Sequence, residues 1–363
     1  MVGSGEFGRS LHRMLEFGER KVWKHCMSDF IKGMDISTLL EVEKLGGKFY
    51  KDGIEMELLS ILETYGVNYV RLRLWNDPFS EDGKPYGAGG NDFETTMMLA
   101  KRALKKKMGF LLDFHYSDFW TDPGKQFVPK AWRGMNVDEL EQAVFDYTKE
   151  TLLALKREEA FPTMIQVGNE LTNGMLWPYG QVPEYDNLAR FVNAGIKAVR
   201  AVDKDVPIMI HLDNGGNNEL YRTWFDEFMK RGENFQIIGM SYYPFWHGTL
   251  ADLENNMNDV AKRYGKDIII AEVSMGFTME DYQGYEKLPD EQRKGMATRP
   301  ALAEKVEYPI TPEGPCGNEW ANQELFDYDG NALPAFDTIR DFLNKHKAFL
   351  LHKCESILNL RDI

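Results

Sequence analysis

The sequence predicts an α/β fold of the (β/α)8 barrel class, and two observations support this. Seven apolar runs alternate with amphipathic stretches, which is the pattern of a parallel sheet covered on both faces. No Gly-rich phosphate loop follows any of these runs, so a barrel is favoured over a doubly wound sheet. The expected strands are residues 30–36, 69–75, 110–116, 164–170, 208–212, 237–243 and 268–273. The expected helices are residues 53–65, 93–107, 137–155, 187–202, 219–230, 250–264 and 332–345.

One catalytic domain is expected at residues 29–346, between an irregular extension at 1–28 and a tail at 347–363. Beyond the seventh strand, residues 276–317 are polar and rich in Pro and Gly, and they contain no apolar run long enough for an eighth strand. A barrel without this strand would have open sheet edges, which are costly.

Composition limits the partners and the compartment. The net charge of −14 argues against nucleic acid and anionic membrane as partners, since both require clustered Lys and Arg, and it fits a neutral substrate. Cys26, Cys316 and Cys354 lack the spacing of a disulfide framework or a metal site. No stretch reaches the length of a membrane span. The first residues lack the apolar core of a secretory signal, so the chain as given is expected in the cytoplasm, unless a signal is missing from it.

Two glutamates provide the strongest functional signal. Glu170 closes the run 164–170, and Glu272 lies in the run 268–273. A carboxylate at the tip of a buried strand is costly unless chemistry needs it, and the tips of strands four and seven can face each other across a barrel mouth. Such a pair suits glycoside cleavage, with about 5–5.5 Å between the carboxyl groups for retention and about 6.5–9.5 Å for inversion. A carboxylate that caps the following loop is the alternative for Glu170 alone.

In a retaining mechanism, Glu170 would be the acid/base and Glu272 the nucleophile. An arginine of the second strand, Arg71 or Arg73, would favour the Glu272 anion, because both arginines point to one side of that strand. Burial and the Glu272 charge are expected to raise the pKa of Glu170. Asn169 would donate to the sugar 2-hydroxyl.

His115 lies in a polar and aromatic segment at 113–126. Such a histidine is more often structural than catalytic, and we expect it to form hydrogen bonds near the acid/base. The spacing of His, Asp and Glu residues requires no metal. No Gly-x-Ser-x-Gly elbow or reactive cysteine environment indicates ester or thiol chemistry.

Eight segments resemble one known family. They are GMDIS at 33–37, VRLRLW at 70–75, LDFHYSD at 112–118, DPGKQ at 122–126, QVGNE at 166–170, SYYP at 241–244, AEV at 271–273 and NQELFD at 322–327. In this order they resemble the endo-β-1,4-galactanases (arabinogalactan endo-β-1,4-galactosidases) of glycoside hydrolase family 53. The resemblance extends from residue 30 to about residue 342.

The resemblance implies a (β/α)8 barrel that hydrolyses β-1,4-galactan of type I arabinogalactan, in pectin side chains, with retention and without a cofactor. By position it implies Glu170 as proton donor and Glu272 as nucleophile. The matching supporting positions are Arg71 or Arg73, His115, Asn169 and Tyr242. The candidate substrate contacts are Trp120, Lys125, Trp132 and Asn214.

Two departures from the family accompany this resemblance. Many bacterial members bind calcium through an Asp-x-Asp-x-His-x-Asn run after strand seven, and residues 275–284 have no such run, so no metal is expected. Members also have a helix and an eighth strand between regions that match 311–314 and 316–320, and these regions abut in this chain. The eighth-strand region is therefore predicted to be deleted.

Two alternatives to a galactanase stay open. One is another β-1,4-glycanase of the same clan, such as a mannanase or an endoglucanase. The other is a carbohydrate-binding barrel with impaired catalysis, because the deletion affects the region that carries part of the site in the family. The family is usually secreted, and the sequence does not indicate an oligomeric state.

Overall fold

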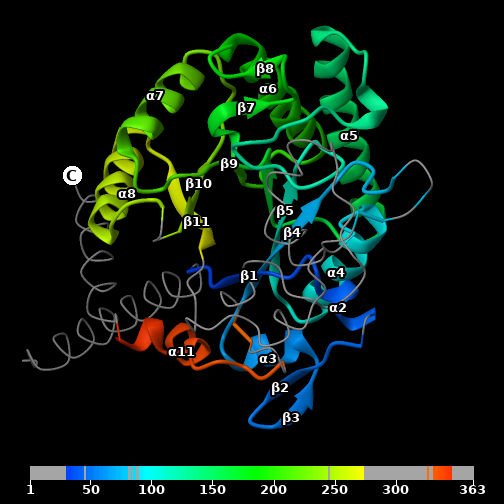
Figure 1. The fold of residues 1–363 in the computed structure, drawn as a ribbon, viewed down its shortest axis with the longest axis vertical. Helices are drawn as coiled ribbons and strands as arrows, with labels where there is room; N and C mark the ends of the chain where they lie inside the picture. Colours follow the sequence, from blue (N-terminus) through cyan, green and yellow to red (C-terminus); the bar gives the residue numbers. More distant parts are fainter. Residues whose placement is uncertain are drawn as a thin grey trace, which may run out of the picture.

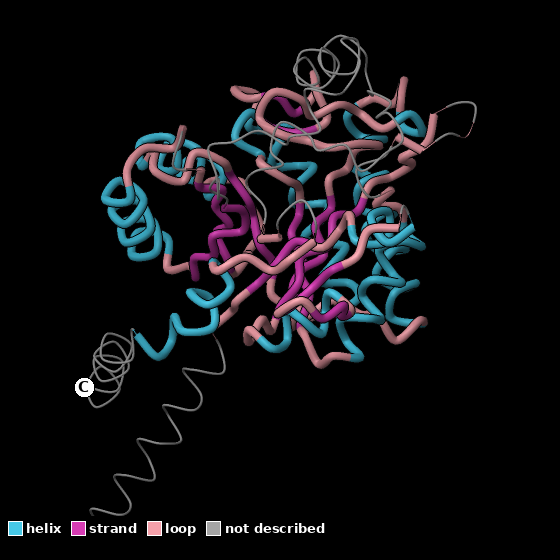
Figure 2. The backbone as a smooth tube through the Cα atoms, turned by 60° about the horizontal axis from the view of Figure 1, so that its bottom comes forward, coloured by secondary structure: helices cyan, strands magenta, loops and turns pink. Residues whose placement is uncertain are grey.

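Seven parallel strands form one curved sheet, and helices cover its outer face (Figures 1 and 2). The computed structural model describes residues 30–273 except 45, 81–82, 84, 87–89 and 244–245, together with 325–326 and 330–345, where only the backbone of 342–345 is described. The strand order is β1-β4-β5-β6-β9-β10-β11, so each strand of the sheet pairs with the next one along the chain. This topology confirms the predicted barrel class.

The elements follow the alternation expected from the sequence. The sheet strands are β1 Gly33–Asp35, β4 Tyr69–Leu74, β5 Gly109–Phe114, β6 Met164–Val167, β9 Ile208–Leu212, β10 Ile237–Tyr242 and β11 Asp267–Val273. The helices between them are α3 Leu58–Thr64, α4 Phe93–Lys105, α5 Val137–Arg157, α6 Tyr185–Val202, α7 Asn218–Met229 and α8 Leu250–Tyr264. The remaining elements are α2 Leu39–Lys44, β2 Phe49–Lys51, β3 Ile54–Met56, the 3-10 turns η1 Lys130–Trp132 and η2 Leu171–Asn173, β7 Gly174–Met175, β8 Gly180–Gln181 and α11 Ala335–Lys345.

The inner face of the sheet has an apolar layer below a polar layer. Leu111, Met164, Met209 and Ile237 form a buried cluster in the first halves of their strands. Side chains two positions apart in a strand share one face, so Asp113, Gln166 and His211 form the next layer. All three of these polar side chains are fully buried. The apolar layer therefore supports a polar site at the C-terminal ends of the strands, where barrel enzymes bind their substrates.

Several predicted element ends differ from the structure, and two of the differences have a clear local cause. The helix predicted at 53–65 begins at Leu58, because residues 49–56 form the β2–β3 hairpin. Its two-residue turn is Asp52–Gly53, both with positive φ (53° and 75°), and Asp-Gly is a favoured pair for such a turn. The strand predicted at 164–170 ends at Val167, because the chain turns at Gly168, which has a φ of 81°.

Strand β11 is less buried than the other long strands of the sheet. Its residues are partly buried or exposed, and Val273 is 61% exposed, whereas most residues of β4, β5, β9 and β10 are buried. The predicted deletion of the eighth-strand region, the extension at 1–28 and the tail at 347–363 lie outside the described residues. None of the helices in the described part is long and apolar enough to cross a membrane.

Helix α11 follows the undescribed residues 274–324 in the chain and packs beside α3 (Figure 1). Phe336 of α11 is fully buried. Its ring stacks on Tyr65, with 4.7 Å between centroids, and lies 5.2 Å from the ring of Phe326. These contacts bring the C-terminal part of the described chain onto the first helical unit of the barrel.

We expect Phe336→Ala to lower the free energy of unfolding by about 3–5 kcal/mol, because it removes a fully buried ring. Urea unfolding followed by far-UV circular dichroism measures the change. Asp337→Ala, at an exposed position one residue further on, should have a much smaller effect. Equal effects of the two substitutions would show that α11 is not docked on α3.

Candidate active site

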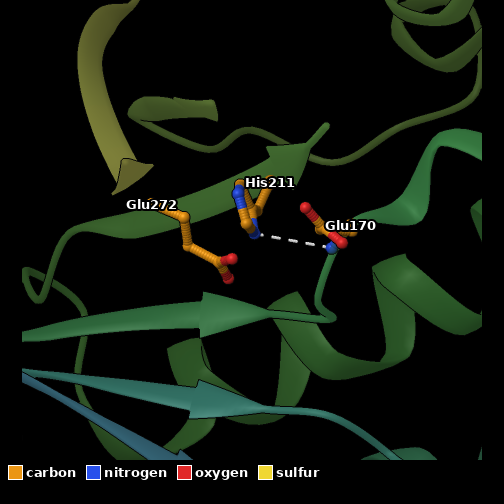
Figure 3. A group of neighbouring side chains, drawn as sticks. All are labelled: Glu170, His211 and Glu272. Carbon is orange, nitrogen blue, oxygen red and sulfur yellow. Dashed lines mark hydrogen bonds between the residues drawn. The ribbon is translucent and has the colours of Figure 1, made fainter. Parts of the chain in front are cut away.

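Glu170 and Glu272 meet at the C-terminal end of the sheet (Figure 3). Glu170 follows β6, and Glu272 lies on β11. One carboxylate oxygen of each and one ring nitrogen of His211 lie within 4.8 Å of one another. The two carboxyl groups are therefore close enough for the retaining arrangement of about 5–5.5 Å, and closer than the roughly 6.5–9.5 Å of an inverting one.

A tight turn after β6 presents Glu170 to the site. A Cβ atom at Gly168 would lie 2.6 Å from the Leu171 side chain, so this turn requires glycine. Glu170 itself has a φ of 47°, an uncommon conformation for a residue other than glycine. The Gln126 amide donates to the carbonyl oxygens of Asn169 (2.8 Å) and Glu170 (3.3 Å), which helps to hold the strained turn.

The surroundings of Glu170 favour its protonated form. Burial and then the charges of Glu272 and Asp213 raise the pKa of Glu170 well above its usual value. The Ser241 hydroxyl donates to Oε1 of Glu170 at 2.6 Å and offsets part of this rise. A buried carboxyl group whose pKa is raised in this way can act as a general acid.

Glu272 has two close polar partners. Nη2 of Arg71 lies 2.9 Å from Oε1 of Glu272, and the Tyr243 hydroxyl donates to Oε2 at 2.8 Å. Burial and then the charges of Glu272 and Glu170 raise the pKa of Tyr243, so this hydroxyl keeps the proton that it donates. An anionic carboxylate is therefore supported at both oxygens.

Arg71 joins several elements of the site. Its guanidinium lies 2.8 Å from Asp113 and 3.2 Å from Asp35, in addition to its contact with Glu272. Burial alone would lower the pKa of Arg71, but the three carboxylates outweigh it and raise the pKa. Arg71 therefore stays charged and compensates carboxylates on β1, β5 and β11.

Asn169 and His115 form hydrogen bonds with protein groups around the two glutamates. Oδ1 of Asn169 accepts from Arg71 at 2.8 Å, and its Nδ2 donates to the Thr121 carbonyl at 2.8 Å. The amide that was expected to donate to a sugar thus has a protein partner. His115 lies 2.9 Å from Asp113 and accepts or shares hydrogen bonds with Thr121. His115 is therefore linked to Glu170 indirectly, through Asp113, Thr121 and the residues that they contact.

Arg73 and Trp120 form a stacked pair beside the ion-pair network. The Arg73 guanidinium lies 4.2 Å from the centroid of the Trp120 ring, and Trp120 is 37% exposed. Nε of Arg73 lies 3.5 Å from Asp35, and Nε and Nη1 are buried without a hydrogen-bond partner. Of the two arginines expected to support the nucleophile, the contact with Glu272 belongs to Arg71.

The other three residues predicted to contact the substrate lie in three separate parts of the structure. Lys125 pairs with Asp122 at 2.5 Å in the loop after β5. Asn214 follows β9, and its amide donates to Asp213, whose charge acts on Glu170. Trp132 belongs to the hydrophobic core, with its ring 5.8 Å from that of Tyr147.

Tyr242, predicted to support the site, does not contact either glutamate by a hydrogen bond. Its hydroxyl donates to the Gly248 carbonyl at 2.9 Å, while the next residue, Tyr243, contacts Glu272. Side chains alternate between the two faces along β10, which places Ser241 and Tyr243 on the same face. This alternation in the sequence could have identified Tyr243. Gln166, His211 and Ser241 also belong to the site, and no role was predicted for them, although each precedes the end of an inward-facing strand.

A metal ion does not suit the cluster of Glu170, His211 and Glu272. The ring nitrogens of His211 lie 2.9 Å from Ser241 and 3.2 Å from the Gln166 amide, so both already have protein partners. The expectation of no metal and no cofactor stays a prediction.

Two facing carboxyl groups with opposite surroundings, at the C-terminal end of a parallel barrel sheet, define a glycoside hydrolase. Comparison with known proteins names the family. The sequence profile of Glycosyl hydrolase family 53 matches residues 31–314, and the chain belongs to this family.

Individual relatives agree with this assignment. The endo-beta-1,4-galactanase of Bacillus subtilis is 36% identical over 287 residues, which cover 79% of this chain and 64% of that protein. The GH53 catalytic domain of Ignisphaera aggregans is 36% identical, with a TM-score of 0.76 over 86% of this chain and 96% of that domain. A fungal beta-1,4-galactanase is 26% identical, with a TM-score of 0.70 over 85% of this chain and 98% of that one.

Tyr243→Phe should lower kcat for glycoside hydrolysis by about 10–100-fold, because it removes one of the hydrogen bonds to Glu272. Tyr242→Phe is the matched control, since that hydroxyl donates to a backbone carbonyl instead. Steady-state kinetics on both variants tests the assignment. A larger loss in Tyr242→Phe than in Tyr243→Phe would contradict it.

Glu170→Gln should stabilise the protein at pH 8 and have little effect at pH 4. The pKa of Glu170 is raised on folding, so the folded state loses stability as pH rises from the usual glutamate range toward the raised pKa. Glutamine keeps the shape without the charge. Calorimetry should show a higher Tm at pH 8, by about 2–4 °C for each kcal/mol gained. Glu254→Gln, at an exposed position on α8, is the control, and a pH-independent gain for Glu170→Gln would refute the burial argument.

Proposed function

We propose that this chain is a retaining endo-β-1,4-galactanase that cleaves galactan polymers or oligosaccharides of type I arabinogalactan, with Glu170 as acid/base and Glu272 as nucleophile. The observation that carries the reaction is the close pair of carboxyl groups in opposite surroundings. The names of the galactanase relatives support the substrate. A net charge of −14 suits a neutral polysaccharide.

In the first step, a Glu272 oxygen attacks the anomeric carbon and forms a glycosyl ester. The bond from that carbon to the leaving oxygen breaks, and Glu170 transfers its proton to this oxygen. Arg71 and Tyr243 hold the Glu272 carboxylate. Their positions fix the direction from which the carboxylate approaches the sugar.

In the second step, water attacks the anomeric carbon from the side that the leaving group left. Glu170, now an anion, takes a proton from this water, and Glu272 is released as a carboxylate. The charge of Glu272 is one cause of the raised pKa of Glu170. Formation of the ester removes this charge and so lowers the pKa of Glu170, which converts the acid into the base that the second step needs.

Purified protein should release reducing ends from potato galactan faster than from mannan or cellulose. Proton NMR should show the β-anomer of the product first, because the carboxyl groups are spaced for retention. Glu272→Ala should lower kcat by more than about 10⁴-fold, and azide should restore turnover by giving a glycosyl azide of inverted configuration.

Different outcomes separate the alternatives. Cleavage of mannan or cellulose alone would replace galactan by another β-glycan. Binding of galactan with no turnover in either the wild type or Glu170→Gln would indicate a carbohydrate-binding barrel. Appearance of the α-anomer first would refute the retaining mechanism.

A further inference from the structure

Three buried polar side chains form a chain of hydrogen bonds behind Glu170. Gln166, His211 and Ser241 come from β6, β9 and β10, and each is fully buried. Nε2 of Gln166 lies 3.2 Å from Nδ1 of His211, and Nε2 of His211 lies 2.9 Å from Oγ of Ser241. Ser241 lies 2.6 Å from Oε1 of Glu170. The proposed two-step reaction assigns no role to these three residues, yet their chain of hydrogen bonds ends at Glu170.

The position of the proton on the His211 ring determines which group donates in each of these hydrogen bonds. Burial and then the charge of Arg71 lower the pKa of His211 well below its usual value, so the ring is neutral and carries one proton. The backbone amide of Glu170 donates to Nδ1 at 3.4 Å. A proton on Nδ1 would deprive this buried amide of that acceptor, which is costly.

Asn169 is the one neighbour that would favour the other tautomer. Its Oδ1 lies 3.0 Å from Nδ1 of His211, but this oxygen already accepts from the charged guanidinium of Arg71 at 2.8 Å. A carbonyl oxygen with a charged donor is satisfied without a second one, whereas the backbone amide of Glu170 would lose its acceptor at Nδ1. The proton of His211 therefore belongs on Nε2, which faces Ser241.

We propose that Ser241, oriented by His211, is a positioning residue that fixes which oxygen of Glu170 carries the acid proton. Nε2–H of His211 donates to Oγ of Ser241, so the single hydroxyl proton of Ser241 points to Oε1 of Glu170. Oε1 is thus an acceptor, and the acid proton of Glu170 resides on Oε2. This inference rests on the proposed role of Glu170 as acid/base.

The same hydrogen bond limits the rise in the pKa of Glu170. The charged or titratable groups that act on or contact Glu170 are Glu272 on β11, Asp213 after β9, Asp122 after β5, His211 on β9, Tyr221 on α7 and Tyr243 after β10. Burial and then the three carboxylates raise the pKa of Glu170, and the hydrogen bond from Ser241 counteracts them. Because Glu170 must release a proton and take one back in each cycle, such a counterweight keeps both transfers feasible.

Ser241→Ala should lower kcat/KM on galactan by about 10–100-fold and move the alkaline limb of the pH profile upward. The loss should depend on the leaving group. For a 2,4-dinitrophenyl β-galactobioside, which leaves without acid assistance, the first step should stay within about threefold of the wild type. Ser241→Thr keeps the hydroxyl and should restore the pH profile.

Thr148→Ala is the matched control for loss of a buried hydroxyl. Thr148 on α5 bonds to Tyr116 and to the Val144 carbonyl, and its loss should leave the pH profile and the leaving-group dependence unchanged. If Ser241→Ala lowers the rates on both substrates equally, or if its alkaline limb moves downward, Ser241 does not act in the way proposed.

A direct titration separates this inference from the proposed function. NMR of protein labelled with ¹³C at the glutamate carboxyl carbon, with the Glu170 signal assigned from Glu170→Gln, reports the pKa of Glu170 without any substrate. An upward shift in Ser241→Ala supports the hydrogen-bond chain even if galactan proves to be the wrong substrate. An unchanged or lower value overturns it even if the wild type cleaves galactan.

Discussion

The site depends on one buried positive charge, the guanidinium of Arg71. It contacts Asp35 on β1, Asp113 on β5 and Glu272 on β11, so three strands place carboxylates around a single cation. Without this charge, the carboxylates would repel one another, and Asp113 and Glu272 would lose the cation that contacts them. Its contact with Asn169 extends the network to the turn that presents Glu170. The contacts of Arg71, on β4, therefore help to hold both glutamates in place.

The network also makes the two glutamates different. Glu272 lies against a cation and a phenol, whereas the charges that act on Glu170 are mainly those of other carboxylates. Identical side chains consequently have different electrostatic surroundings, and those of Glu170 favour its protonated form. The difference comes from the strands on which they lie: β11 faces Arg71, while the turn after β6 faces Asp213 and Ser241.

The sequence was sufficient to predict the strands of the sheet and the placement of both glutamates, because apolar runs and period-two alternation follow directly from burial. It was insufficient where the backbone departs from regular geometry. The irregular register between Met240 and Ser241, the turn at Gly168 and the hairpin at Asp52 shift side chains by one position or end an element early. Tyr242 was assigned to the site in place of Tyr243, although period-two alternation along β10 puts Tyr243 on the same face as Ser241. The hydrogen bond between Ser241 and Glu170 joins residues that are far apart in the chain. A single sequence does not show which distant residues form such contacts.

The partial exposure of β11 has a consequence for how the protein responds to heat. This strand carries Glu272, yet its residues are less buried than those of the neighbouring strands. Local opening free energy follows buried contacts, so β11 should detach at lower temperatures than the centre of the sheet. Detachment of β11 would carry Glu272 away from Arg71 and Tyr243, so the two glutamates would separate before the centre of the sheet unfolds.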